Sequence, residues 1–147
     1  MDVEIRQVEK SDIREILDIE QSSFSTPWVT SFFEEELNLP ISRAYRARLG
    51  REDRKLVGYI INRCILDELH ILNIAVHEGF RRRDIATQLF KHSLEQNPQV
   101  RTAHLEVRER NGGARAFYRK MGFIEIGRCR RYYSDTGEDA IAMAWLS

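Results

Sequence analysis

Apolar and polar positions change their period between residues 71 and 90, where two different elements meet. Residues 71–76 form a mostly apolar run with β-branched side chains, which is typical of a strand covered on both faces. Beyond Asp84, apolar residues recur at steps of three and four, which indicates a helix with Asp84 as its N-cap. Three consecutive arginines precede Asp84. The pattern therefore predicts a buried strand, a positively charged turn and a helix.

Similar patterns divide the rest of the chain into strands and helices. Apolar stretches bounded by turn residues predict strands at 3–8, 44–49, 55–66, 102–107, 123–133 and 140–146. Helical spacing with capping and stop residues predicts helices at 13–19, 30–37 and 112–121, with Gly122 as a stop signal. The order βααβββαβαββ predicts a mixed α/β or α+β fold, a single sheet with helices on both faces. We expect residues 1–147 to form one domain, because the length suits one and no linker or repeat interrupts it.

Charge and composition exclude several classes of protein. Basic and acidic residues balance at 23 each, so no global positive field attracts nucleic acid. No apolar run approaches the length of a membrane span, and the first residues lack the basic start and apolar core of a secretory signal. We therefore expect a cytoplasmic protein. Cys64 and Cys129 lie far apart without metal-binding spacing, so we expect reduced, buried thiols.

The arginine turn is the strongest local candidate for a binding site. A helix N-terminus leaves backbone N–H groups unpaired and carries the positive end of the helix dipole, so an anion is stabilised there. Arg81, Arg82 and Arg83 add positive charge at the same place. Taken alone, an arginine triplet in a loop is more often a solvated surface segment. Its position between a buried strand and a helix favours a phosphate-binding turn.

Longer stretches around this turn point to a family. Residues 81–86 read Arg-Arg-Arg-Asp-Ile-Ala, where the GNAT superfamily of acyl-CoA-dependent N-acyltransferases has Arg/Gln-x-x-Gly-x-Gly/Ala after a strand. Three further stretches resemble its RimI branch, the ribosomal-protein-alanine N-acetyltransferases: LHILNIAVHEGFRRR, HLEVRERNGGARAFYRKMGF and RRYYSDTGEDAIAMAW. FSTPW near the N-terminus fits the same branch. The resemblance covers essentially the whole chain and implies the GNAT-type acyl-CoA N-acyltransferase fold.

The resemblance also implies a reaction and a place for the donor. The reaction is acetyl transfer from acetyl-CoA to the α-amine of a protein N-terminus, typically an alanine of a small-subunit ribosomal protein, with no metal. The pantetheine would pair with the first of two splayed parallel strands, and the pyrophosphate would bind the backbone N–H groups of the turn. The matching cofactor-binding positions are Ile74, Ala75, Val76, Arg81, Arg82, Arg83, Asp84, Ile85, Ala86, Thr87 and Asn111.

Two side chains match the family's catalytic pair, Glu106 as general base and Tyr118 as general acid toward the CoA sulfur. Burial between Leu105 and Val107 is expected to raise the pKa of Glu106 toward the operating range. We expect the two side chains to converge on the thioester. Taken singly, each residue has a plainer interpretation: Glu106 on the solvent side of a strand, Tyr118 as a core aromatic, and Asn111 as a helix cap.

One departure from the motif affects donor binding. Asp84 stands where the motif has its first glycine, which adds a Cβ and a carboxylate close to two phosphate charges. A like charge at about 4 Å costs roughly 1 to 4 kcal/mol, depending on the local dielectric. The neighbouring arginines would offset much of this cost, and Asp is a good helix cap. We therefore expect Asp84 to weaken CoA binding without abolishing it.

The acceptor side has weaker signals. By the resemblance, residues 24–28 and 132–133 wall a peptide groove. Asp67, Glu68 or the acidic run 34–36 would attract a basic N-terminal peptide, although acidic runs on helices usually face water. Alternative acceptors are a lysine side chain, other N-terminal residues and a small-molecule amine. A catalytically weak acyl-CoA-binding subunit is an alternative class, whereas the balanced charge disfavours an RNA-binding module.

Overall fold

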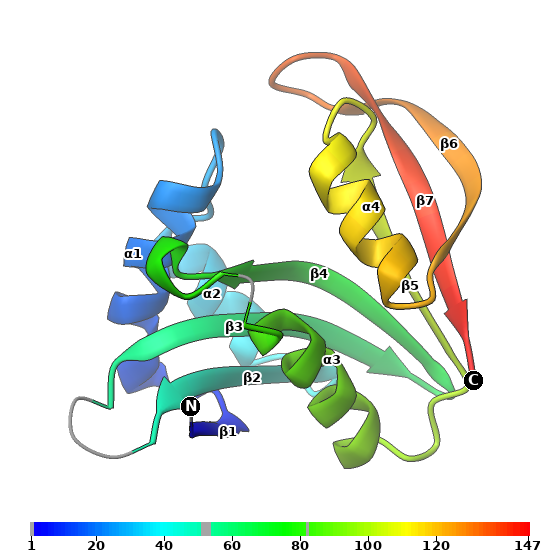
Figure 1. Ribbon diagram of the computed structural model, residues 1–147. Helices are drawn as coiled ribbons and strands as arrows, with labels where there is room; N and C mark the ends of the chain where they lie inside the picture. The colour runs from blue at the N-terminus through cyan, green and yellow to red at the C-terminus, as the bar shows by residue number, and fades with distance from the viewer. Residues whose placement is uncertain (1, 51–53, 82) are drawn as a thin grey trace.

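The computed structural model describes residues 2–50, 54–81 and 83–147, and these contain one seven-stranded sheet in the order β1-β2-β3-β4-β5-β7-β6 (Figure 1). The strands are β1 (Val3–Gln7), β2 (Ser42–Leu49), β3 (Leu56–Ile65), β4 (Glu68–Val76), β5 (Thr102–Arg108), β6 (Ile124–Tyr133) and β7 (Glu138–Leu146). The helices are α1 (Ile13–Ser23), α2 (Thr30–Leu37), α3 (Ile85–Gln96) and α4 (Gly112–Lys120), with 3-10 turns η1 (Lys10–Asp12) and η2 (Glu78–Phe80). The predicted order of strands and helices is confirmed.

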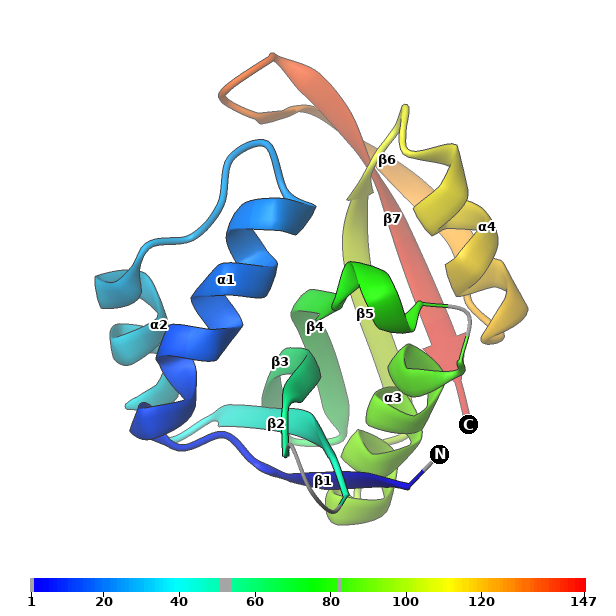
Figure 2. The ribbon, with the colours of Figure 1, turned by 60° about the vertical axis from the view of Figure 1, so that its left-hand side comes forward.

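Helices cover both faces of the sheet, as predicted. Helices α1 and α2 pack on one face around a core cluster that includes Ile16, Phe33 and Tyr59. Helix α3 packs on the opposite face through Leu89 and Phe90, and α4 lies against the same cluster. Figure 2 shows the first pair of helices and the second pair on either side of the strands. We call these two surfaces the α1–α2 face and the α3–α4 face.

Strand β4 changes the direction of its side chains at a bulge. The register of β3 against β4 skips Leu72, which is therefore an extra residue in β4. An extra residue shifts the side-chain alternation of the strand by one. Ile71 accordingly packs on the α3–α4 face, Ala75 packs on the α1–α2 face, and Ile74 packs against the α3–α4 cluster. The apolar run predicted to be covered on both faces is covered in this way.

Strands β4 and β5 pair only at their beginnings. The parallel register joins Glu68 to Thr102, Leu69 to Ala103 and His70 to His104. Further along, β5 stays paired with β7 to its end, while β4 stays paired with β3 to its end. The two central strands therefore separate beyond His70, and this separation splits the sheet next to α4 (Figure 1).

The thiols differ in their surroundings, although both are free. Cys64 is buried, as predicted, whereas the prediction of burial is wrong for Cys129, which is only partly buried. The reason is that Cys129 lies on β6, an edge strand paired on one side only.

Among the described residues, no helix is long and apolar enough to cross a membrane.

Candidate active site

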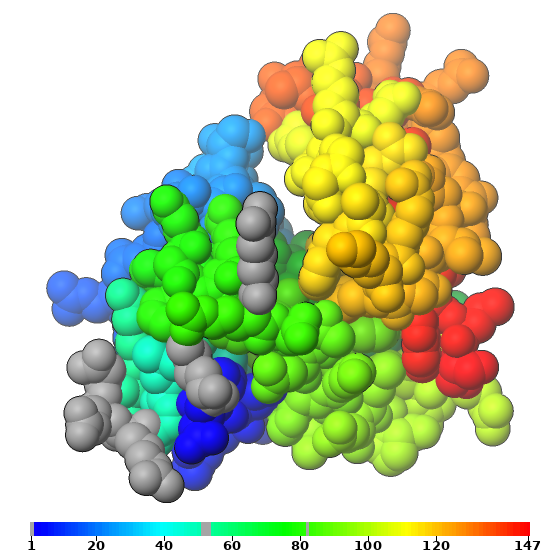
Figure 3. All heavy atoms as spheres, viewed as in Figure 1, coloured from blue at the N-terminus to red at the C-terminus, as the bar shows by residue number. Residues whose placement is uncertain are grey.

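The separation of β4 and β5 frames the candidate site. The space-filling view shows the surface hollowed between the β4 end of the sheet and α4 (Figure 3). Within the described part of the chain, no strand pairs with residues 74–76 on their β5 side. Backbone groups on that side are therefore available to a ligand that lies in the opening, and these are the positions predicted to bind pantetheine. The carbonyl of Val76, one of these positions, already accepts a hydrogen bond from Arg81 Nε at 3.3 Å.

Helix α3 begins beside this opening, and Asp84 is its N-cap residue, as predicted. The Asp84 side chain, however, does not cap the helix. Asp84 has φ 58° and ψ 18°, in the left-handed region, and its side chain makes no capping hydrogen bond. The prediction of a side-chain cap is wrong, because a capping side chain bonds the next turn from an extended backbone conformation. Glycine adopts the left-handed region without a steric cost. The conformation thus explains why the family motif has glycine here.

The arginines of the turn are only partly described. Arg82 lies outside the described residues, while Arg81 and Arg83 are exposed. The Arg83 guanidinium lies 5.6 Å from the centroid of the Phe80 ring, a cation–π distance. The turn therefore presents positive side chains beside the start of α3. Whether they neutralise Asp84 stays a prediction.

The first turn of α3 offers a ligand mainly its backbone. Ile85 is buried in the α3–α4 cluster, whereas Ala86 and Thr87 are partly exposed. Gly58 permits this close packing, because an added Cβ there would lie 3.2 Å from Ile85 Cγ2 and 3.2 Å from the Ala75 carbonyl oxygen. Ile85 can thus contribute to a phosphate site through its N–H but not through its side chain.

Glu106 projects from β5 onto the α1–α2 face, because its neighbours Leu105 and Val107 point into the α3–α4 cluster. His70 Nε2 donates to Glu106 Oε1 at 2.8 Å, and the Tyr132 hydroxyl donates to the same oxygen at 3.4 Å. The hydrogen bond from His70 lowers the pKa of Glu106 and outweighs burial, which acts in the opposite direction. The predicted rise in pKa is therefore wrong, since the sequence indicates burial but not a partner 36 residues away.

Tyr118 is partly buried and packs against the α3–α4 cluster, with its ring centroid 5.5 Å from that of Phe117 and 5.9 Å from that of Phe123. Burial, and to a lesser degree Tyr133, raises the pKa of Tyr118 well above its usual range. The phenol therefore stays protonated at neutral pH. Glu106 and Tyr118 lie on opposite faces of the sheet, Glu106 on β5 beside the separation from β4 and Tyr118 on α4. Their convergence on the thioester stays a prediction.

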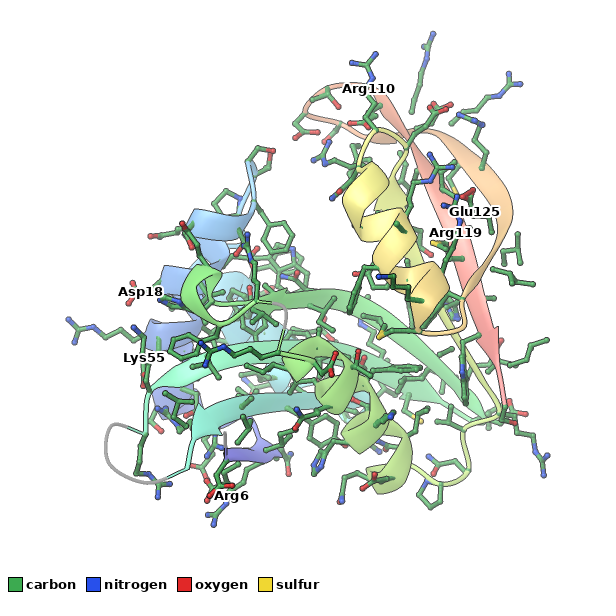
Figure 4. The ribbon with its side chains drawn as sticks, viewed as in Figure 1. Arg6, Asp18, Lys55, Arg110, Arg119 and Glu125 are labelled. Atoms are coloured by element: carbon green, nitrogen blue, oxygen red, sulfur yellow. The ribbon has the colours of Figure 1, made fainter. Side chains whose placement is uncertain are left out.

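Helix α4, which carries this phenol, is fixed at both ends. Arg115 Nη2 donates to both carboxylate oxygens of Glu125 on β6 at 2.8 Å, and Arg119 binds the same carboxylate. Figure 4 shows Arg119 and Glu125 side by side at the outer edge of α4. At the start of the helix, Asn111 Oδ1 accepts the Ala114 N–H at 3.1 Å. The plainer interpretation of Asn111 as a helix cap is thus confirmed, and its contact with CoA stays a prediction.

Residues 24–28, predicted to wall the acceptor groove, are bonded to the loop that follows the other predicted wall residues, 132–133 at the end of β6. Thr26 Oγ1 donates to Asp135 Oδ2 at 2.6 Å, which joins the α1–α2 loop to the β6–β7 loop. Arg108 Nη2 donates to the same oxygen at 2.8 Å and its guanidinium stacks 4.0 Å from the centroid of the Tyr133 ring. Burial raises the pKa of Tyr133 to about 12. These contacts hold the α1–α2 loop against the β6–β7 loop.

Two of the acidic residues considered for attracting a peptide are engaged elsewhere, whereas Glu35 is exposed on α2. Glu36 is buried and pairs with Arg63, whose Nη2 lies 2.7 Å from Glu36 Oε1. Glu34 forms a surface ion pair. Asp67 is exposed in the turn between β3 and β4, and Glu68 is exposed at the start of β4. Of the predicted acidic attractors, Glu36 is therefore unsuitable because its charge is buried and paired.

Sequence reasoning missed Glu20, a carboxylate that is 1% exposed. It accepts hydrogen bonds from the Trp28 N–H at 2.9 Å, from Asn73 Nδ2 at 2.7 Å and from the Tyr59 hydroxyl. These donors come from the α1–α2 loop, β4 and β3. Glu20 thus links residues 24–28, predicted to wall the acceptor groove, to β4, the strand predicted to bind pantetheine. The available signal was its spacing, because Glu20 lies four residues after Ile16 on the apolar stripe of α1.

Comparison with known proteins agrees with this geometry. Residues 13–123 match the Acetyltransferase (GNAT) family. The chain is 32% identical to a ribosomal protein bS18-alanine N-acetyltransferase of Escherichia coli (strain K12), over 95% of this chain and 95% of that protein. The crystal structure of the ribosomal-protein-S18-alanine N-acetyltransferase from Escherichia coli has a TM-score of 0.86 and 30% identity, covering 99% of this chain and 94% of that chain.

A more distant structure shares the fold alone. Arabidopsis thaliana NAA60 in complex with acetyl-CoA has a TM-score of 0.87 at 20% identity, covering 99% of this chain and 100% of that chain. The family match spans most of the chain, and the fold agrees from end to end. This chain therefore belongs to the acetyltransferase (GNAT) family.

Proposed function

We propose that this chain transfers the acetyl group of acetyl-CoA to the α-amine of a protein N-terminus, and that the acceptor is the N-terminal alanine of a small-subunit ribosomal protein. The names of its relatives supply the substrate class. The observation that carries the proposal is the placement of an ionised Glu106 and a protonated Tyr118 on the two sides of one opening in the sheet.

The donor would lie in the separation of β4 and β5. Residues 74–76 would pair with the pantetheine through backbone groups that no strand uses. The pyrophosphate would meet the N–H groups of residues 84–87 at the start of α3, where the helix dipole and Arg81 and Arg83 stabilise negative charge. Binding through backbone groups makes the side chains of this turn partly interchangeable.

Glu106 would take the proton of the attacking amine. An N-terminal amine has a pKa of about 7.7 to 8.0, so a minority is already neutral near pH 7 and the rest loses its proton at a small cost. The carboxylate is ionised throughout this range because its pKa is lowered. Oε1 is occupied by His70 and Tyr132, whereas no described residue donates to Oε2. Oε2 is thus the oxygen that receives the proton, directly or through a water molecule.

Tyr118 would act on the other side, as the carbon–nitrogen bond forms and the carbon–sulfur bond breaks. A thiol ordinarily titrates near 8.5, below the raised pKa of Tyr118, so complete proton transfer from the phenol to the thiolate is uphill. The phenol would therefore act mainly by donating a hydrogen bond to the sulfur. This hydrogen bond would lower the barrier, because it strengthens as negative charge develops on the sulfur. Tyr118 therefore contributes mainly to kcat.

A peptide assay tests the proposal. Three matched peptides are incubated with the enzyme and acetyl-CoA and followed by intact mass: one starts with free alanine, one has a blocked N-terminus and a free lysine, and one has both amines blocked. We expect a single acetyl group on the first peptide only. Modification of the second peptide alone would show a lysine acetyltransferase. Acetyl-CoA binding by calorimetry without any transfer would show an acyl-CoA-binding subunit.

A further inference from the structure

His70 lies where β4 and β5 stop pairing, and it contacts the proposed general base directly. His70 and His104 form the last register pair between the two strands. His70 Nε2 lies 2.8 Å from Glu106 Oε1, with side-chain exposures of 28% and 19%. An ionised carboxylate has no proton to give, so the imidazole is the donor in this hydrogen bond. The contact therefore requires a proton on Nε2.

The ring of His70 is held in place by its neighbour. His104 stacks on it with centroids 4.3 Å apart and planes 19° apart. Around the hydrogen-bonded pair of His70 and Glu106, the charged and titratable groups are Glu68 on β4, His104 on β5 and Tyr132 at the end of β6. The stack fixes the plane of the imidazole, which aims Nε2 at one oxygen of Glu106.

A glutamate needs such a partner to serve as a directed base. Glu106 stands on a strand at the edge of an opening, and its side chain has several rotamers of similar energy in the absence of a partner. A hydrogen bond to Oε1 leaves Oε2 as the free oxygen and fixes its direction. A misplacement of about 1 Å in a reacting group can cost about 100-fold in rate. Orientation is therefore a large part of what a contact at Oε1 can contribute.

We infer that His70 is a positioning residue for catalysis: its Nε2–H holds Oε1 of Glu106 so that Oε2 faces the amine of the acceptor. This inference rests on the proposed function, because it takes Glu106 as the general base. It assigns a role to a histidine that lies in the family-matching stretch LHILNIAVHEGFRRR but was given no role from the sequence. The role needs a hydrogen-bond donor at the place of Nε2 and does not need a charge.

Two substitutions of His70 separate a donor from mere packing. Gln reaches a similar position with an N–H donor, so H70Q is expected to keep kcat within about 3-fold of the wild type. Leu fills similar space without a donor, so H70L is expected to lose about 10- to 100-fold in kcat, as for groups that orient a ligand or base. The KM for acetyl-CoA should stay unchanged in both, because His70 does not lie at the turn. H92L is the matched control, a half-buried histidine on α3 away from Glu106.

A second measurement does not depend on activity. Carboxyl-labelled glutamate, with the Glu106 signal assigned by its loss in E106Q, reports the titration of Glu106 by NMR. We expect the apparent pKa of Glu106 to rise in H70L and to stay near the wild-type value in H70Q. Thermal unfolding of each variant confirms that it is folded.

The outcomes distinguish this inference from the proposed function. An inactive E106Q together with a fully active H70L would overturn the role of His70 alone, and so would a loss in H70Q equal to that in H70L. A fully active E106Q, or a wild type that modifies no peptide, would overturn the proposed function and this inference with it.

Discussion

Replacing Asp84 separates two costs that the turn imposes on acetyl-CoA binding, one from charge and one from shape. Asp84→Asn keeps the Cβ and a side chain that tolerates the left-handed region, and it removes only the charge. Asp84→Gly removes the charge and the Cβ together. Asp84→Ala removes the charge but leaves a residue that disfavours φ 58°. Compared in this order, the variants isolate each contribution.

The structure sets the size of the charge contribution. Asp84 is exposed, so its repulsion with a phosphate charge at about 4 Å is close to the value in water, about 1 kcal/mol for each charge. Two phosphate charges give about 2 kcal/mol at most, and the neighbouring arginines reduce this. A gain of about 1 to 2 kcal/mol corresponds to about 5- to 30-fold in affinity. We therefore expect Asp84→Asn to lower the Kd for acetyl-CoA by about that factor.

Calorimetric titration with acetyl-CoA at low and high salt is the assay. The gain in Asp84→Asn should shrink at high salt, because surface charges are screened there. Asp84→Gly should bind tighter still, since backbone then approaches the phosphates without a Cβ. Asp84→Ala should unfold about 2 to 4 °C below Asp84→Asn, for a backbone cost of about 1 kcal/mol. An unchanged Kd in Asp84→Asn at low salt would refute the electrostatic reasoning, and equal Kd values in Asn and Gly variants would refute the steric part.

Three further predictions concern Glu20, Tyr118 and Asp135. Glu20→Gln should cost about 1 to 3 kcal/mol in stability and raise the KM for the peptide more than that for acetyl-CoA, as thermal unfolding and steady-state kinetics would show. Tyr118→Phe should lower kcat about 10- to 100-fold with an unchanged Kd for acetyl-CoA, and a kcat equal to that of the wild type would exclude its role. Arg108 and Thr26 lower the pKa of Asp135 to about 2, so their contact should stabilise the fold above the usual carboxyl pKa and be lost as pH falls through about 2. The difference in melting temperature between wild type and Asp135→Asn, followed from pH 5 to pH 2, should vanish toward the acid end.

The element order was predictable because capping and stop residues mark most ends. The helix predicted at 30–37 has those bounds in the structure, and Gly122 follows α4 with φ 103°, a conformation that favours glycine. The bulge at Leu72 was not predictable, because it depends on how β3 pairs with β4. That bulge determines which side chains of β4 face α1 and which face α3.

The electrostatics of the candidate site were harder to predict than the order of its strands and helices. The family motif predicts Glu106 and Tyr118 as the catalytic pair, but the pKa of Glu106 depends on His70, which is close only because two parallel strands align. The conformation of Asp84 was also hidden, since a helical pattern reads the same whether its N-cap residue is extended or left-handed. The local sequence predicts which residues are buried, whereas the direction of a pKa shift depends on partners on other strands of the sheet.

The placement of the two proposed catalytic groups on opposite faces has a chemical consequence. A base that serves an amine arriving from solvent must stay ionised, which suits Glu106 on the open α1–α2 face with donors at one oxygen. A group that donates to a thiolate must keep its proton, which suits Tyr118 against the α3–α4 cluster, where charge is disfavoured. One shared pocket would expose both groups to the same dielectric and weaken this contrast. In the proposed mechanism the separation of β4 and β5 would let two environments act on one thioester, and a Tyr118 that titrated in its ordinary range would remove the reason for that arrangement.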